Sequence, residues 1–236
     1  MSLLEVEGLR VGYGFPVLMG ISFAVEEGET AVMFGLNGAG KTTTVATIAG
    51  LLKPDAGRIR FDGDDITKTS AAERVALGIA LVPEGRRVFP DLSVANNLRL
   101  GAWTKRRHPK AIEEARALVF DYFPRLAERS EQMAGTLSGG EQQMLAIARA
   151  LMSRPRLLLV DEASLGLSPA LTQTVFSVVD RINNDGVTVV LVEQNVGVLP
   201  YADRALIMEK GTLVYQGSGD EIHSGSLRET YLGTPA

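Results

Sequence analysis

The sequence predicts an α/β fold. It has a parallel-sheet core, antiparallel strands at the N-terminal end, and a helical subdomain inserted into the core. Two observations lead to this prediction. Short apolar runs rich in branched residues alternate with helical stretches, as buried parallel strands do; these runs are residues 30–34, 78–82, 157–160 and 187–192. Between residues 92 and 151 no such run occurs, and apolar residues recur at helical spacing instead.

Composition limits the classes of protein to which the chain can belong. Its 236 residues fit one domain with a subdomain, and 45% hydrophobic residues suffice for a substantial core. A net charge of −4 argues against a nucleic-acid-binding surface. The absence of cysteine excludes disulfides and thiolate metal sites. No signal peptide and no apolar run of the ~18 residues that a spanning helix needs is visible, so we expect a chain soluble by itself.

The strands at the two ends of the chain are predicted to be antiparallel. Near the N-terminus apolar residues partly alternate, as in a strand with one buried face: Leu4, Val6, Leu9 and Val11. Near the C-terminus the runs 205–208 and 212–215 flank a Lys210-Gly211 turn, which predicts a hairpin. The core strand 187–192 follows Asn-Asn-Asp-Gly at 183–186, a strong helix stop and turn.

Helices are predicted on either side of the core strands and throughout the inserted segment. One helix, 43–51, follows the first core strand, and another, 144–151, precedes the third. Between residues 109 and 126 the apolar residues fall at helical spacing: Ile112, Ala115, Val119 and Tyr122. We therefore expect one inserted helical subdomain, with no linker and no internal repeat.

A glycine-rich loop separates the first core strand from its helix. Residues 35–42, Gly-Leu-Asn-Gly-Ala-Gly-Lys-Thr, match the phosphate-loop pattern G-x-x-x-x-G-K-[ST] without a gap. Glycines let backbone N–H groups turn toward phosphate oxygens, and the helix N-terminus adds partial positive charge. Lys41 is expected to neutralise the β- and γ-phosphates, and the Thr42 hydroxyl to bind Mg²⁺. The predicted ATP-binding set is Gly35, Asn37, Gly38, Ala39, Gly40, Lys41, Thr42 and Thr43.

Two acidic residues end the apolar strand 157–160. In P-loop enzymes an Asp at this position supports Mg²⁺, which predicts that role for Asp161. Glu162, one residue further on, could orient and deprotonate the attacking water. The simpler alternative is a strand that ends in solvated acids.

A second glycine motif precedes the predicted helix 144–151. Ser138 and Glu141 form a capping-box pattern, so ordinary helix capping explains part of the motif. Two adjacent glycines, Gly139 and Gly140, exceed what a cap needs and leave room for a large anion at a helix start.

This second motif resembles the signature motif of ABC-type ATPases. With the phosphate loop and the Asp161-Glu162 pair, in that order, the resemblance covers essentially the whole chain. It implies a P-loop NTPase (RecA-like) core over 1–90 and 152–236 and a helical subdomain over about 91–151. It also implies a head-to-tail pair in which Ser138 and Gly140 contact the γ-phosphate of ATP held by the partner. Tyr13 would stack on adenine, although packing within a strand is the alternative.

Four stretches further resemble the ATPase subunits of branched-chain amino acid importers, in particular the shorter of the two; they are 82–90, 161–169, 191–195 and 231–233. This resemblance implies an ATP-hydrolysing subunit that energises import of branched-chain amino acids or a related small polar solute. Implied partners are a second ATP-binding subunit, integral membrane permeases and, indirectly, a solute-binding protein. The pair would be a heterodimer, with a homodimer possible in isolation, at the cytoplasmic face of the membrane. The permease would dock at residues 86–89.

Some positions depart from the general ABC pattern. Glu84 stands where a Gln usually contacts Mg²⁺ and water; a Glu can still bind the metal, but it adds negative charge. Gln194 stands where a His is usual; it can hydrogen-bond the γ-phosphate but cannot carry a proton charge. Two alternatives therefore stay open: a module that binds ATP with little hydrolysis, and a soluble ABC ATPase of DNA repair or translation.

The remaining candidate ligands carry no predicted function. His108 and His223 lie outside every motif and are expected at the surface, so no metal other than Mg²⁺ is predicted. The basic run 105–107 is expected to be a solvated loop; an acidic partner or lipid headgroups are the alternative.

Overall fold

The central sheet carries the candidate site residues at one of its edges. In the computed structural model, which describes residues 2–219 and 221, its strand order is β10-β9-β3-β8-β7-β6. All neighbours run parallel except β9 and β10. The strands are β3 (Thr30–Phe34), β6 (Ile79–Val82), β7 (Leu157–Asp161), β8 (Thr188–Glu193), β9 (Arg204–Glu209) and β10 (Thr212–Ser218).

The predicted core strands are confirmed, with shifted ends. β6 begins one residue later than predicted because Gly78, at φ 105°, adopts the left-handed conformation that ends the preceding helix α2 (Ala71–Leu77). β7 and β8 each extend one residue further, to Asp161 and Glu193, because their backbones still pair with neighbours there. Parallel strands end at one edge of a sheet, so the residues after β3, β7 and β8 meet.

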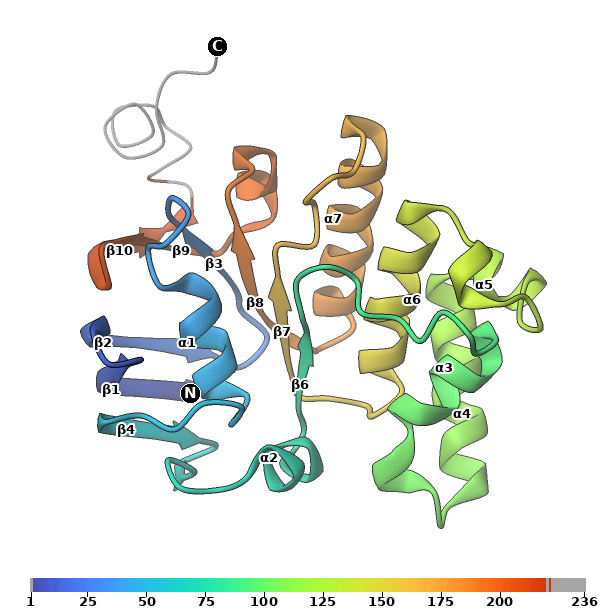
Figure 1. Cartoon of the computed structure of the whole chain (residues 1–236), viewed down its shortest axis with the longest axis horizontal. Helices are drawn as coiled ribbons and strands as arrows, with labels where there is room; N and C mark the ends of the chain where they lie inside the picture. Colours follow the sequence, from blue (N-terminus) through green and yellow to red (C-terminus); the bar gives the residue numbers. More distant parts are fainter. Residues whose placement is uncertain (1, 220, 222–236) are drawn as a thin grey trace.

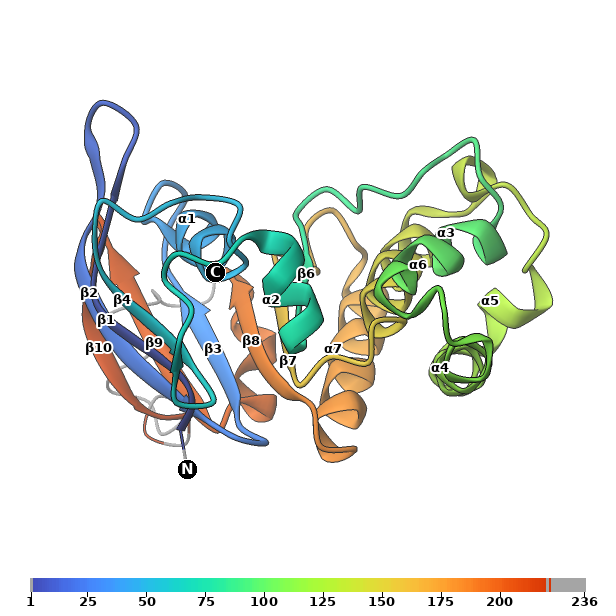
Figure 2. The same ribbon diagram turned by 90° about the horizontal axis from the view of Figure 1, so that it is seen from below.

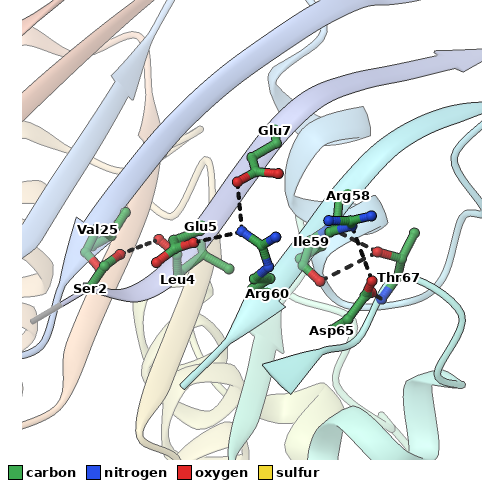
Figure 3. Close-up of polar contacts among 10 residues, drawn as sticks. All are labelled: Ser2, Leu4, Glu5, Glu7, Val25, Arg58, Ile59, Arg60, Asp65 and Thr67. Atoms are coloured by element: carbon green, nitrogen blue, oxygen red, sulfur yellow. Dashed lines mark hydrogen bonds and ion pairs between the residues drawn. The ribbon is translucent and has the colours of Figure 1, made fainter. Parts of the chain in front are cut away.

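A second, antiparallel sheet confirms the N-terminal prediction. Its order is β2-β1-β4-β5, formed by β1 (Ser2–Gly12), β2 (Pro16–Glu26), β4 (Ala56–Phe61) and β5 (Asp64–Asp65). Polar side chains link its strands (Figure 3). Arg60 Nη1 lies 2.7 Å from Glu7 Oε1 and 3.3 Å from Glu5 Oε2, so β4 and β1 are joined by ion pairs.

The helices of residues 92–151 lie beside the central sheet, on the side away from the N-terminal sheet (Figures 1 and 2). They are α3 (Val94–Gly101), α4 (Pro109–Tyr122), α5 (Pro124–Glu128) and α6 (Gly139–Leu151). The single helix predicted over 109–126 is interrupted at Phe123, because Pro124 has no N–H and keeps the preceding residue out of the helical region. Outside this group lie α1 (Lys41–Ile48), α2 and α7 (Pro169–Asn184).

Two hydrophobic cores sandwich the central sheet. On β3, Val32 and Phe34 belong to the core shared with the helical side, whereas Ala31 and Met33 belong to the core shared with the N-terminal sheet. This alternation follows from the two-residue period of a strand. Both cores thus fix the end of β3, where the glycine-rich loop begins. In the described part of the chain, no helix combines the length and the apolarity needed to traverse a bilayer.

Candidate functional site

The glycine-rich loop leads from β3 directly into α1, which begins at Lys41, two residues earlier than predicted. Tight packing requires two of its glycines. A Cβ on Gly35 would lie 2.5 Å from the Met208 carbonyl oxygen. One on Gly40, which has φ 103°, would lie 2.7 Å from Leu18 Cδ2. No larger residue fits these positions, so the backbone N–H groups of the loop are held close to the start of α1.

The ammonium group of Lys41 is buried at the centre of the site, with only 4% of the residue exposed. Its Nζ donates to the carbonyl oxygens of Gly35 (2.8 Å) and Leu36 (3.2 Å). It also lies 3.4 Å from Glu162 Oε1. A buried cation paired with a carboxylate is a group that an incoming phosphate can engage.

Thr42 and Asp161, 119 positions apart, meet at the start of α1. The Thr42 hydroxyl donates to Asp161 Oδ1 at 3.2 Å. Burial raises the pKa of the Asp161 carboxyl to about 6; the charges of Glu162 and Glu84 also raise it, whereas the Thr42 hydrogen bond and Lys41 lower it. One carboxylate and one hydroxyl suit Mg²⁺, which takes few protein ligands and completes its shell with phosphates and water. Among residues 2–219 and 221, no cluster of three His, Asp or Glu side chains could hold a metal.

Gln194 joins the ends of three strands. Its Nε2 donates to Glu162 Oε1 and to Asn37 Oδ1, both at 2.8 Å. Glu162 itself has φ 47°, in the left-handed region that is costly for a residue with a Cβ. Lys41 Nζ and Gln194 Nε2 both contact Oε1 of this carboxylate.

Several of these side chains line a cavity of about 250 Å³ at the edge of the sheet, although Asp161 and Gln194 do not. Glu84, an exposed carboxylate after β6, lies on its wall, as does Val17 at the start of β2. Val17 was missed by sequence reasoning, because its approach depends on how the two sheets pack. The other lining residues are Asn37, Gly38, Gly40, Lys41, Thr42, Thr43 and Glu162. Gly35 and Ala39 instead line a separate cavity of about 280 Å³ on the β9 side of the loop.

The predicted contacts of the second glycine motif are not assembled within this chain. Neither Tyr13, which is 53% exposed, nor residues 138–140 line the 250 Å³ cavity. Ser138 caps α6: its hydroxyl accepts from the Glu141 N–H (3.3 Å), and its own backbone N–H donates to Glu141 Oε2 (2.9 Å), which confirms the capping box. α6 begins at Gly139, five residues before the predicted start.

Side chains from other segments also lie close to the two glycines, which the sequence did not reveal. A Cβ on Gly139 would lie 2.8 Å from the terminal nitrogens of Arg86. One on Gly140 would lie 2.9 Å from Leu171 Cδ1. His108 is exposed, as predicted; His223 and the stretch 231–233 lie outside the described residues.

Comparison with known proteins identifies the family. Residues 18–165 match the family model described as ABC transporter. The high-affinity branched-chain amino acid transport ATP-binding protein BraG of Pseudomonas aeruginosa is 42% identical over 234 residues, 98% of this chain and 100% of that protein. The lipopolysaccharide export system ATP-binding protein LptB of Escherichia coli is 31% identical over 236 residues, 99% and 98% of the two chains.

Solved structures agree with the fold. One ATP-binding cassette of an ABC transporter superposes with a TM-score of 0.87 at 29% identity, over 98% of this chain and 97% of its own. A dimeric cassette in a post-hydrolysis state, bound to ADP and Pi, gives a TM-score of 0.82 at 25% identity, over 91% and 98%. The predicted fold class is thereby confirmed. The chain belongs to the ABC transporter family, as one of its ATP-binding and ATP-hydrolysing cassettes.

Proposed function

We propose that this chain energises an ABC importer of branched-chain amino acids or a related small polar solute. The proposed ATPase activity rests on the convergence of Lys41, Thr42 and Glu162 on one cavity, with Gln194 hydrogen-bonded to Glu162. Similarity to BraG, whose name specifies branched-chain amino acid transport, supports the solute class because it extends over 98% of the chain.

The proposed roles follow from the chemistry of each group. Backbone N–H groups of residues 35–43 bind the phosphates, and Lys41 neutralises their charge. Thr42 and Asp161, with Glu84 beside them, hold Mg²⁺, whose chemistry when bound is to offset charge on the transferring phosphoryl group. Glu162 removes the proton of the attacking water.

Gln194 and Tyr13 are proposed as further nucleotide contacts because both residues are exposed. Gln194 donates a hydrogen bond to the γ-phosphate through the amide that now contacts Glu162. The exposed Tyr13 ring stacks on adenine. Both groups are available without rearrangement of the core.

A second subunit completes the proposed site. Ser138, Gly139 and Gly140 lie at the start of α6 and outside the cavity. The Ser138 N–H donates to Glu141 Oε2, so the N–H groups of Gly139 and Gly140 are the ones proposed to donate to ATP held by another cassette. The dimeric cassette bound to ADP and Pi supports such a pairing. The working pair is a heterodimer with a second ATP-binding subunit, and isolated chains can form a homodimer.

Membrane permeases bind this pair at the cytoplasmic face, and a solute-binding protein acts on them from the other side. The docking segment is 86–89, where Phe89 is 50% exposed. The proposed subdivision is an ATP-binding core over 1–90 and 152–236 and a helical subdomain over about 91–151. No nucleic acid takes part.

Glu162→Gln tests this function. The variant is expected to bind MgATP, to lose hydrolysis and to form a stable ATP-bound dimer, because the amide keeps the shape but cannot take the proton. Nucleotide binding, phosphate release and light scattering after gel filtration measure the three effects. Glu209→Gln, at an exposed carboxylate in an ion pair with Lys210, is the matched control and should leave all three unchanged. Hydrolysis at the parent rate in Glu162→Gln would remove Glu162 from its role.

An exporter is the second candidate, because LptB proteins are 30–31% identical over nearly the whole chain. The neighbouring open reading frames distinguish the two. Two permeases, a second ATPase and a solute-binding protein support import. Co-purification with permeases and no solute-binding protein supports export.

A further inference from the structure

Glu193 is a buried carboxyl group to which the proposed hydrolysis assigns no role. It is the last residue of β8, it is 1% exposed, and it pairs in register with Phe34, the last residue of β3. Burial raises the pKa of this carboxyl to about 7. A carboxyl group buried at the edge of a sheet is costly unless its hydrogen bonds are satisfied.

Both oxygens of Glu193 are satisfied by one residue. The Ser164 backbone N–H donates to Oε1 at 3.0 Å, and the Ser164 hydroxyl donates to Oε2 at 2.6 Å. Ser164 lies two residues after Glu162, in the segment between β7 and α7. This two-point contact therefore ties the segment that follows Glu162 to the end of β8.

Glu162 is consequently held by three consecutive residues, the last two of β8 and the residue that follows it. Its own N–H donates to the Val192 carbonyl oxygen at 2.9 Å. The Glu193 carboxyl accepts from Ser164, two residues after Glu162, and the Gln194 amide donates to the Glu162 carboxylate. Glu162 has φ 47°, a conformation that persists only where the surrounding contacts impose it.

We propose that Glu193 is a positioning residue: by holding Ser164 it keeps Glu162 in its left-handed conformation, with the carboxylate directed at the cavity. The inference rests on the proposed role of Glu162 as the base. Glu193 does not line the cavity, so it acts through Glu162 rather than on ATP.

Steady-state ATPase kinetics of Glu193→Ala provide the first test. We expect kcat to fall about tenfold or more, because a misplaced base loses alignment with the water, whereas the KM for ATP stays within about twofold. Glu29→Ala is the matched control. Glu29 is likewise a carboxylate that accepts from a backbone N–H, that of Glu26 at 2.7 Å, but it is half-buried and precedes β3 at the opposite edge of the sheet. The Glu29→Ala variant should be less stable than the parent and keep the parent kcat.

Amide hydrogen exchange of the nucleotide-free chain is the second test. In Glu193→Ala, exchange should accelerate in residues 163–168 and stay unchanged in β7. Glu193→Gln, whose amide oxygen still accepts from the Ser164 N–H, should fall between the parent and Glu193→Ala in both tests.

Two results would overturn the proposal: unchanged kcat and exchange in Glu193→Ala, or an equal loss of kcat in Glu29→Ala. A parent chain that binds MgATP without turnover, alone and with its partners, would refute the proposed function instead. In that case, amide hydrogen exchange of residues 163–168 still tests whether Glu193 holds this segment, because the measurement does not depend on turnover.

Discussion

At the scale of single residues, the site consists of side chains that are distant in sequence and share hydrogen bonds. Thr42 meets Asp161, and Gln194 bridges Asn37 and Glu162. Gln194 stands where the family usually has a histidine, yet its neutral amide makes two donor contacts at once. The position therefore serves as a hydrogen-bond donor without titrating near neutral pH.

The buried carboxyl of Glu193 predicts a pH dependence of stability. Its pKa is raised from 4.5 to about 7, so between these values the folded chain binds a proton that the unfolded chain releases. The free energy of unfolding of the parent should therefore fall relative to Glu193→Gln as pH rises through this window, by up to about 3 kcal/mol. Urea denaturation at several pH values between 5 and 8 measures the difference. Parallel profiles for the two proteins would show that Glu193 titrates normally.

At the scale of elements, helix ends decide where the glycine motifs lie. α1 begins at Lys41 and α6 at Gly139, so each motif sits at a helix N-terminus. α2 carries the same capping box as α6, with Ser70 in place of Ser138 and Glu73 in place of Glu141. The chain thus contains a built-in comparison between a cap that is only structural and one proposed to contact nucleotide.

Ser138→Ala and Ser70→Ala exploit this comparison. Each variant should lose about 1 kcal/mol of stability, because each removes the acceptor of an N-terminal N–H. Only Ser138→Ala should also reduce ATP-driven dimerisation in the Glu162→Gln background. Chemical denaturation and light scattering report the two effects. An equal effect of both variants on dimerisation would restrict Ser138 to its capping role.

At the scale of the whole molecule, the site lies where two cores meet the end of the central sheet. β3 contributes Ala31 and Met33 to one core and Val32 and Phe34 to the other, and the phosphate loop follows directly. Because the loop is attached to both cores, a ligand bound there is linked to the stability of the entire fold.

MgATP should therefore raise the melting temperature of the Glu162→Gln chain. At a ligand concentration of about 100 times Kd, the expected stabilisation is about 2.7 kcal/mol. Lys41→Ala, introduced into the same background, should abolish most of this increase because it removes the buried cation that meets the phosphates. Differential scanning calorimetry with and without MgATP measures the increase in melting temperature of each variant. A full shift in the Lys41→Ala variant would place ATP elsewhere.

The sequence by itself determined the local chemistry. The spacing of Gly35, Gly40 and Lys41 specifies a turn that leads into a helix, and branched apolar runs specify buried strands, because both signals act within a few residues. Element ends were less predictable. The interruption before Pro124 could have been read from the proline, whereas the extension of β7 to Asp161 depends on pairing with β8.

Only the tertiary structure decided which distant groups meet. Parallel pairing brings the ends of β3, β7 and β8 to one edge, and this places Gln194 on Glu162 and Glu193 on Ser164. Packing of the two sheets adds Val17 to the cavity, and packing of α6 sets Arg86 against Gly139. These contacts arise from strand register and helix packing, which no local pattern specifies, since they depend on the relative placement of elements that are far apart along the chain.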